Sequence, residues 1–264
     1  MGEKNYYIDS EGNAAKGIGL TPVSIEVINK ESGKKETKWI YVDKLGKRAI
    51  HQFYDHASPF NEYGFAMVRL DQDKNERYGF IDQTGKAVVP IIYDLIFPFN
   101  DFGYTKVKKN NMWGYVNLKG EEVIPTEYSS VEFYRDHLIK VYDGSKWGYI
   151  NPFNELVVPI KYDWVWNFRE DLLIVRNGEM HGAVNLKGEE VISLIYEMMK
   201  PFHDGLSAAR LLGKWGYLNT SGHIEIPFVF DDAWNFNQGN AQVKMGNEFF
   251  DIDAKGGKAN PIVQ

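Results

Sequence analysis

The sequence predicts an all-β protein, built as a tandem array of three-stranded antiparallel meanders of about 34 residues each. One short aromatic motif recurs along the chain. A turn follows most copies, and two runs rich in β-branched and aromatic residues follow the turn. No stretch of about 10 to 12 residues has the periodicity of a helix. Aromatic residues make up 15% of the chain, and such side chains pack well on a pleated surface.

The recurring motif is Trp-Gly-Tyr, followed by an aliphatic residue and Asn. The residues that carry it most clearly are Trp39, Trp113, Gly114, Trp147, Gly148, Trp215 and Gly216. The first positions of all copies, weaker ones included, are 5, 39, 78, 113, 147, 181, 215 and 249, so successive steps are 34, 39, 35, 34, 34, 34 and 34 residues. A fixed period in this range is typical of stacked supersecondary units.

We interpret residues 1–264 as one array with a degenerate copy at each end, because terminal copies of such arrays act as caps. The expected modules are 5–38, which is the degenerate cap, then 39–77, 78–112, 113–146, 147–180, 181–214 and 215–248, and a terminal strand in 249–264. We expect an open superhelix or solenoid. A closed propeller-like ring is the alternative, but propeller blades usually have four strands and about 40 residues.

The module that starts at residue 147 illustrates the expected elements. Its three strands are predicted at 147–151, 156–163 and 172–175. Asp or Asn ends each first strand and accepts a backbone hydrogen bond, and Gly usually supplies the positive φ of the turn; here Asn154 takes the Gly place. Proline removes a ladder donor, so the second strands are expected to bulge at this residue. These prolines are Pro90, Pro125, Pro159 and Pro227.

Trp-Gly-Tyr with the downstream Gly, Val-Ile/Val-Pro and Tyr-Asp at this period resembles the bacterial WG-repeat family, also called KWG repeats. The resemblance covers essentially the whole chain. It implies a bacterial β-repeat protein with a role in interaction or at the cell envelope, and it carries no catalytic residue that could be transferred. The chain departs from the pattern at His181, which replaces Trp, and at Ser193, which replaces Pro.

Composition excludes several classes of function. A net charge of -6 argues against a nucleic-acid backbone or an anionic membrane as the main partner. The absence of cysteine excludes disulfides, thiolate metal sites and cysteine nucleophiles, and it leaves the compartment open. No apolar run is long enough for membrane insertion. The start has no apolar signal region, so the chain as written is cytoplasmic, and a trimmed export signal would place it at the envelope.

We find no motif for catalysis, a cofactor or a metal, and we expect a monomeric protein that is not an enzyme. None of the six histidines forms a short-range metal pair. Acidic residues recur after the second-strand Tyr or Phe, at Asp55, Asp94, Asp163 and Asp231, and we interpret them as structural.

Comparison between modules gives one clue to binding. Three residues after the second-strand Tyr or Phe the chain is always apolar, so we expect these residues in the core: Ala57, Ile96, Val131, Val165, Met199 and Ala233. The next residue is a large aromatic in every second module, at Phe97, Trp166 and Trp234. Because an odd strand number reverses the chain direction, we expect alternate modules to present the same face.

The candidate binding surface is therefore Phe97, Trp164, Trp166 and Trp234. Trp164 joins it because it lies two residues before Trp166, on the same face of a strand. The alternative is that these rings pack against the neighbouring module. We expect a non-catalytic scaffold that binds a protein partner, and the alternative is a glycan- or envelope-binding module that uses the aromatic row.

Overall fold

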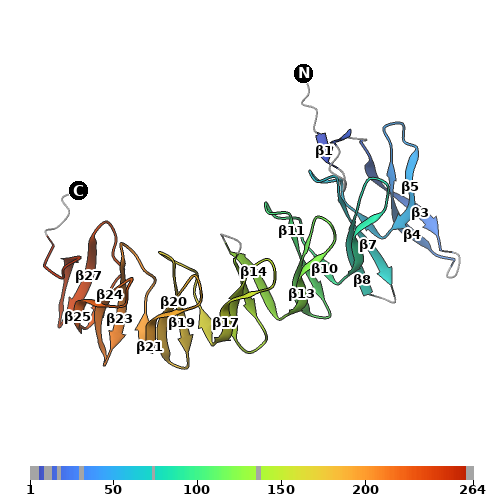
Figure 1. The fold of residues 1–264 in the computed structure, drawn as a ribbon. Coiled ribbons are helices and arrows are strands. Elements are labelled where there is room, and N and C mark those ends of the chain that lie inside the picture. The colour runs from blue at the N-terminus through green and yellow to red at the C-terminus, as the bar shows by residue number, and fades with distance from the viewer. Residues whose placement is uncertain are drawn as a thin grey trace, which may run out of the picture. The chain divides into compact units, whose positions relative to one another are not determined.

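The computed structural model describes residues 6–8, 14–16, 19–29, 33–72, 75–134 and 138–259. These residues form antiparallel sheets in tandem and contain no helix, which confirms the all-β repeat array (Figure 1). The chain divides into two compact units, Met1–Ser129 and Ser130–Gln264, called unit 1 and unit 2.

Unit 1 contains a strand pair and three sheets, in which strands pair in chain order. The pair is β1 (Tyr6–Ile8) and β2 (Ala14–Lys16). The sheets are β3 (Thr21–Ile28), β4 (Lys35–Val42) and β5 (Arg48–Tyr54); β6 (His56–Ala57), β7 (Ala66–Gln72), β8 (Asn75–Ile81) and β9 (Ala87–Tyr93); and β10 (Leu95–Ile96), β11 (Tyr104–Lys109), β12 (Met112–Asn117) and β13 (Glu122–Tyr128).

Unit 2 continues the pattern with four sheets. They are β14 (Ser130–Tyr134), β15 (Leu138–Tyr142), β16 (Trp147–Ile150) and β17 (Leu156–Tyr162); β18 (Trp164–Val165), β19 (Leu172–Asn177), β20 (Met180–Asn185) and β21 (Glu190–Tyr196); β22 (Met198–Met199), β23 (Leu206–Leu211), β24 (Lys214–Asn219) and β25 (Ile224–Phe230); and β26 (Asp232–Ala233), β27 (Asn240–Met245) and β28 (Glu248–Asp253).

Sheet boundaries fall inside the modules that the sequence motif defines. The third strand of the module at 147, β19, pairs with the first strand of the next module, β20, and belongs to that sheet. The chain leaves one sheet at Tyr162 and enters the next at Trp164 through a short strand, β18, that the sequence did not predict. Each complete sheet therefore has four strands, and one sequence repeat contributes to two sheets.

Neighbouring sheets within a unit stack face to face, so that both faces of an inner sheet are buried. Between the β14–β17 and β18–β21 sheets, Tyr149 and Val158 share one apolar cluster with Val165 and Phe168. Equivalent residues form the cluster between the last two sheets: Tyr217, Ile226, Ala233 and Phe236. The six apolar residues predicted for the core are all buried.

The structural period within unit 2 is thus one sheet, and the expected two-module period is wrong. The short fourth strand makes the strand number of a complete sheet even, so that each sheet turns the same positions toward the next sheet. Within each unit the sheets follow one another in an open stack, as expected for a solenoid, and they do not close into a ring.

The next strand bulges over the glycine of the motif and approaches it closely. The β16–β17 register shifts on either side of Tyr149, which confirms the bulge expected at Pro159. A Cβ atom on Gly148 would lie 2.6 Å from the carbonyl oxygen of Val158. The obstructing atom is backbone, so no side-chain rotation relieves the clash at Gly148. In the β4–β5 pair, which has the same register shifts, Ile40 takes the place of this glycine.

Turn chemistry also follows the prediction. Oδ1 of Asn151 accepts hydrogen bonds from the backbone N–H groups of Phe153, at 2.9 Å, and Glu155, at 3.0 Å. Asn154, which takes the usual place of glycine, has a φ of 61°. This left-handed conformation is one that asparagine adopts more readily than most other residues.

Because several tyrosines are buried, we expect the free energy of unfolding to fall at alkaline pH. Burial, with a smaller contribution from Asp82, raises the pKa of Tyr54 to about 12, and burial likewise raises the pKa values of Tyr41, Tyr93 and Tyr217. Above pH 10 the unfolded chain ionises while the folded chain does not, so the free energy of unfolding falls as pH rises.

Urea denaturation from about pH 9 to about pH 11 should show a falling midpoint. The buried hydroxyl of Tyr54 has no hydrogen-bond partner among the residues that the structure describes, so Tyr54→Phe should keep the fold and make the fall less steep. A midpoint that does not change over this range would contradict the buried, neutral state of these phenols.

Candidate functional site

The recurring acids that follow the second strands join one sheet to the next. Asp163 accepts a hydrogen bond from Nζ of Lys146 at 2.5 Å and another from the backbone N–H of Gly178 at 2.6 Å. The hydrogen bond from Lys146, followed by that from Gly178, holds the pKa of Asp163 below its usual value. Asp231 makes the same two contacts, with Lys214 and Gly246. These contacts support the structural interpretation of the acids.

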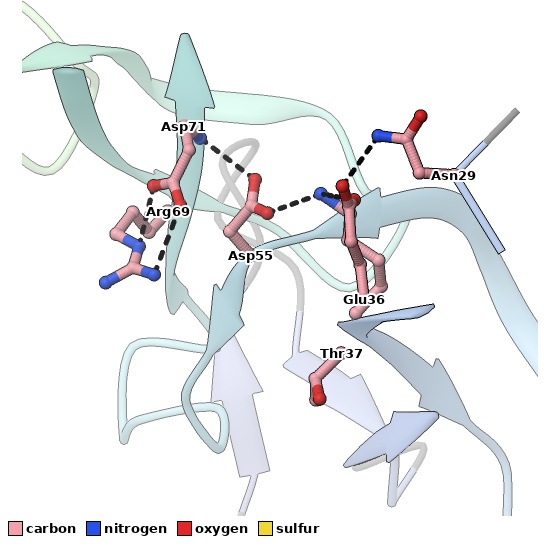
Figure 2. A pocket seen from close by; sticks show the side chains of 7 residues that line it. Asn29, Glu36, Thr37, Asp55, Arg69 and Asp71 are labelled. Atoms are coloured by element: carbon pink, nitrogen blue, oxygen red, sulfur yellow. Dashed lines mark hydrogen bonds and ion pairs between the residues drawn. The ribbon is translucent and has the colours of Figure 1, made fainter. Parts of the chain in front are cut away.

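The equivalent contacts in unit 1 border an open hollow of about 470 Å³ (Figure 2). Asp55 accepts from Lys38 at 2.5 Å and from the backbone N–H of Asp71 at 2.9 Å, and Arg69 pairs with Asp71. On the far side of the hollow, Glu36 accepts from Asn29 at 2.6 Å. The charged groups that line this hollow are therefore paired with one another.

In unit 2, five rings lie in an unbroken series at the hairpin ends of two neighbouring sheets. They are Tyr142, Trp147, Trp164, Trp166 and His181, which we call the ring cluster. Successive ring centroids are 4.7, 5.6, 6.2 and 5.5 Å apart. Tyr142 pairs with Trp147 across the β15–β16 hairpin, and the other three rings belong to the β18–β21 sheet or the residue that follows its first strand.

A buried lysine lies against two rings of the cluster. Nζ of Lys140 is 4.6 Å from the ring centroid of Trp147 and 4.8 Å from that of Trp164, and the residue is only 8% exposed. Burial lowers the pKa of Lys140, and the charge of its cross-strand partner Glu132 opposes this shift. Cation–π contacts of this kind strengthen when they are desolvated. Lys140 therefore already covers part of the ring faces of Trp147 and Trp164.

Arg176 lies directly between Trp164 and His181 across the sheet, because it is the register partner of both. Nε of Arg176 and Nδ1 of His181 are buried, and within the described part of the chain neither has a hydrogen-bond partner. Burial lowers the pKa of His181, and Arg176 lowers it further, against backbone hydrogen bonds with Tyr196, Glu197 and Glu179 that raise it. Buried polar atoms are nearly always hydrogen-bonded, so the unpaired Nε of Arg176 identifies this row as a candidate site.

The predicted binding residues are not equivalent. Trp164 and Trp234 are 40% and 39% exposed in unit 2, and Phe97 is 42% exposed in unit 1. Trp166 is partly buried and packs against the core between the β18–β21 and β22–β25 sheets. This position agrees with the alternative interpretation, in which the ring packs against the neighbouring module. Trp164 and Trp166 lie side by side within the ring cluster, edge to face at 82°.

The two remaining aromatics have different neighbours. Trp234 lies 6.0 Å from Phe249, and Nζ of Lys200 is 5.4 Å from its ring. Phe97 lies 6.1 Å from Trp113 within unit 1. Neither ring belongs to the ring cluster.

Sequence reasoning did not single out Arg176 or Lys140. A signal for Arg176 exists, because the residue paired with the first motif position is a cation in five of the seven sheets with this pairing: Arg69, Lys108, Arg176, Arg210 and Lys244. The missing information is which of these cations lacks a partner, and that depends on side-chain geometry.

The described residues contain no group of three or more His, Asp or Glu side chains that is placed to hold a metal ion. No helix there could cross a membrane.

Stacked antiparallel sheets that each contain one copy of a short motif define a β-repeat protein. Five consecutive segments match the family model described as WG containing repeat, at residues 78–113, 113–147, 147–180, 182–215 and 215–249. The chain belongs to this family, which confirms the resemblance drawn from the motif.

Comparison with curated proteins finds no match. Similar solved structures include Hsv2p of Kluyveromyces lactis, with 12% identity, a TM-score of 0.36 and coverage of 73% of this chain and 71% of that one. PorZ of Porphyromonas gingivalis has 7% identity and a TM-score of 0.32, over 94% of this chain and 40% of that one. The acylaminoacyl peptidase of Pyrococcus horikoshii has 11% identity and a TM-score of 0.28, over 89% and 48%.

Proposed function

We propose that this WG-repeat chain is a non-catalytic scaffold that binds a protein partner at the hairpin edge of unit 2. The observation that carries the proposal is the ring cluster. Stacking covers both faces of the inner sheets, so edges and loops are left for recognition. At this edge Trp164 exposes a large ring next to Arg176, which forms no ion pair with a described residue. Trp and Arg are the residue types that most often dominate protein–protein binding energy.

A glycan is the less favoured ligand for physical reasons. Sugar binding usually needs an aromatic face that is open for stacking. Here Trp147 stacks on Tyr142, and Lys140 lies over both Trp147 and Trp164. Trp166 packs against the core between two sheets. The cluster therefore offers ring edges and part of one indole, which suits the side chains of a protein surface better than a sugar ring.

Substitution of Trp164 tests the proposal. A photo-cross-linking residue at this position identifies the partner, and calorimetry with that partner in purified form then measures its affinity. Trp164→Ala should weaken binding by about 30-fold, as expected for a central aromatic contact, and should change the melting temperature little because the ring is partly exposed.

The matched control is Phe153→Ala, because Phe153 is 80% exposed in the turn at the opposite end of the β14–β17 sheet. Its affinity should equal that of the unchanged protein. Equal affinity in Trp164→Ala, or calorimetric binding of a saccharide selected on a glycan array, would overturn the proposal.

A further inference from the structure

Four other sheets have a cation at the position equivalent to Arg176, and each of these cations has a partner. Nη1 of Arg69 pairs with Glu76 at 2.8 Å, and Nε of Arg210 pairs with Glu197 at 3.4 Å. Nζ of Lys108 lies 5.2 Å from the ring of Trp113, and Nζ of Lys244 lies 5.4 Å from that of Phe249. Arg176 makes neither an ion pair nor a cation–π contact with any residue that the structure describes.

The length of the preceding acid explains why Arg176 is left alone. In the β22–β25 sheet, Glu197 reaches both the backbone N–H of Gly213 and the guanidinium of Arg210. The equivalent acid before Arg176 is Asp163, which is one methylene shorter. Its two oxygens are already hydrogen-bonded to Lys146 and Gly178, so it acts on Arg176 only through its charge.

The surroundings of Arg176 select the kind of anion that it could take. A guanidinium presents parallel N–H donors that match the two oxygens of a carboxylate. Trp164 and His181 lie on either side of Arg176 in the same row, because both are its cross-strand partners. An anion at this place would therefore lie beside an exposed indole on one side and a neutral imidazole on the other.

We infer that Arg176 binds a carboxylate side chain of the protein partner, with an apolar or aromatic residue of the partner beside it against Trp164. This inference rests on the proposed scaffold function and specifies the chemistry of the partner segment. Charge complementarity supports a carboxylate. Arg176 is the cation between Trp164 and His181, and no carboxylate among the described residues forms an ion pair with it. The occupied indole faces favour a peptide side chain over the ring of an acidic sugar.

The indole N–H signals of the ¹⁵N-labelled full chain provide the test, because seven tryptophans give seven signals. The probe is a blocked peptide with glutamate next to phenylalanine, titrated to saturation at constant ionic strength. It should shift the signals of Trp164 and Trp166. Replacing the glutamate by glutamine should weaken binding by about tenfold or more, as for the loss of a charge-assisted hydrogen bond.

Arg176→Gln should abolish the shifts, and Arg210→Gln is the matched control because it removes the equivalent cation one sheet further along. The control should titrate like the unchanged protein. In the peptide-free spectra, unchanged signals of the tryptophans that are not next to the substituted arginine establish that both variants are folded.

The inference is overturned by an absence of shifts, by equal binding of the glutamine peptide, by retained binding in Arg176→Gln, or by shifts with glucuronate alone. None of these results depends on the identity of the partner. Failure here therefore leaves the scaffold proposal to the Trp164→Ala measurement, which can fail separately.

Discussion

Gly182→Ala should lower the free energy of unfolding by about 3 kcal/mol, the upper part of the range for an overpacked core. A Cβ on Gly182 would lie 2.5 Å from the carbonyl oxygen of Ile192 and 2.9 Å from the backbone nitrogen of Leu194. Both atoms belong to the bulged strand, so relief would require moving the backbone. Urea denaturation followed by tryptophan fluorescence measures the change.

Gly178→Ala in the preceding hairpin is the matched control. Its φ is +60°, and a Cβ there would meet nothing within 4 Å. The loss should be about 1 kcal/mol, which is the strain of a left-handed alanine. Equal losses for the two variants would show that the approach of the bulged strand does not determine the motif glycine.

Tyr149→Ala should produce the other large loss, about 4 kcal/mol, because it leaves a cavity the size of an aromatic ring between two sheets. Tyr149 is fully buried, and its ring centroid lies 5.3 Å from that of Phe168 in the next sheet. Its hydroxyl donates a 2.9 Å hydrogen bond to the carbonyl oxygen of Trp166. The residue therefore joins the two sheets by packing and by a polar contact.

Tyr149→Phe separates these two contributions. It keeps the ring and removes the hydroxyl, so the loss should be about 1 kcal/mol. Denaturation curves of both variants, compared with the unchanged protein, give the two values. A loss for Tyr149→Phe as large as that for Tyr149→Ala would contradict the dominant role of packing at this interface.

Local rules were enough to predict the long strands and the turns, but not the short strands such as β18. Bulges were expected at the prolines and are present there, although β21, which has Ser193 instead, and β5 bulge in the same way. Asn154 was correctly assigned a positive φ, and the six apolar positions after the second strands were correctly assigned to the core. These features depend on a residue and its neighbours along the chain, and a single sequence contains that information.

The grouping of strands into sheets could not be read from the period. A repeat has no marked beginning, so a 34-residue step fits a module that starts at Trp147 and equally a sheet that starts at Trp164. The bend at Asp163 decides between them. It depends on the hydrogen bond from Gly178, fifteen residues later, which is a contact between sheets.

The candidate binding residues were the hardest to predict because their surroundings depend on side-chain packing between strands. Trp166 packs against the core shared with the next sheet and donates a backbone hydrogen bond to Ile174 of its own sheet. The preceding sheet has Lys140 at the position equivalent to Ile174. The unpaired state of Arg176 likewise depends on the reach of Asp163. Sequence comparison finds the variable positions, and the structure shows which of them are left without partners.

In unit 2 the sheets stack so that each motif tyrosine is covered by the next sheet, and nuclear Overhauser contacts can show this at two equivalent places. Contacts are expected between the rings of Tyr149 and Phe168, whose centroids are 5.3 Å apart, and between those of Tyr217 and Phe236, at 4.8 Å. Tyrosine rings that contact only residues of their own sheet would contradict this stacking.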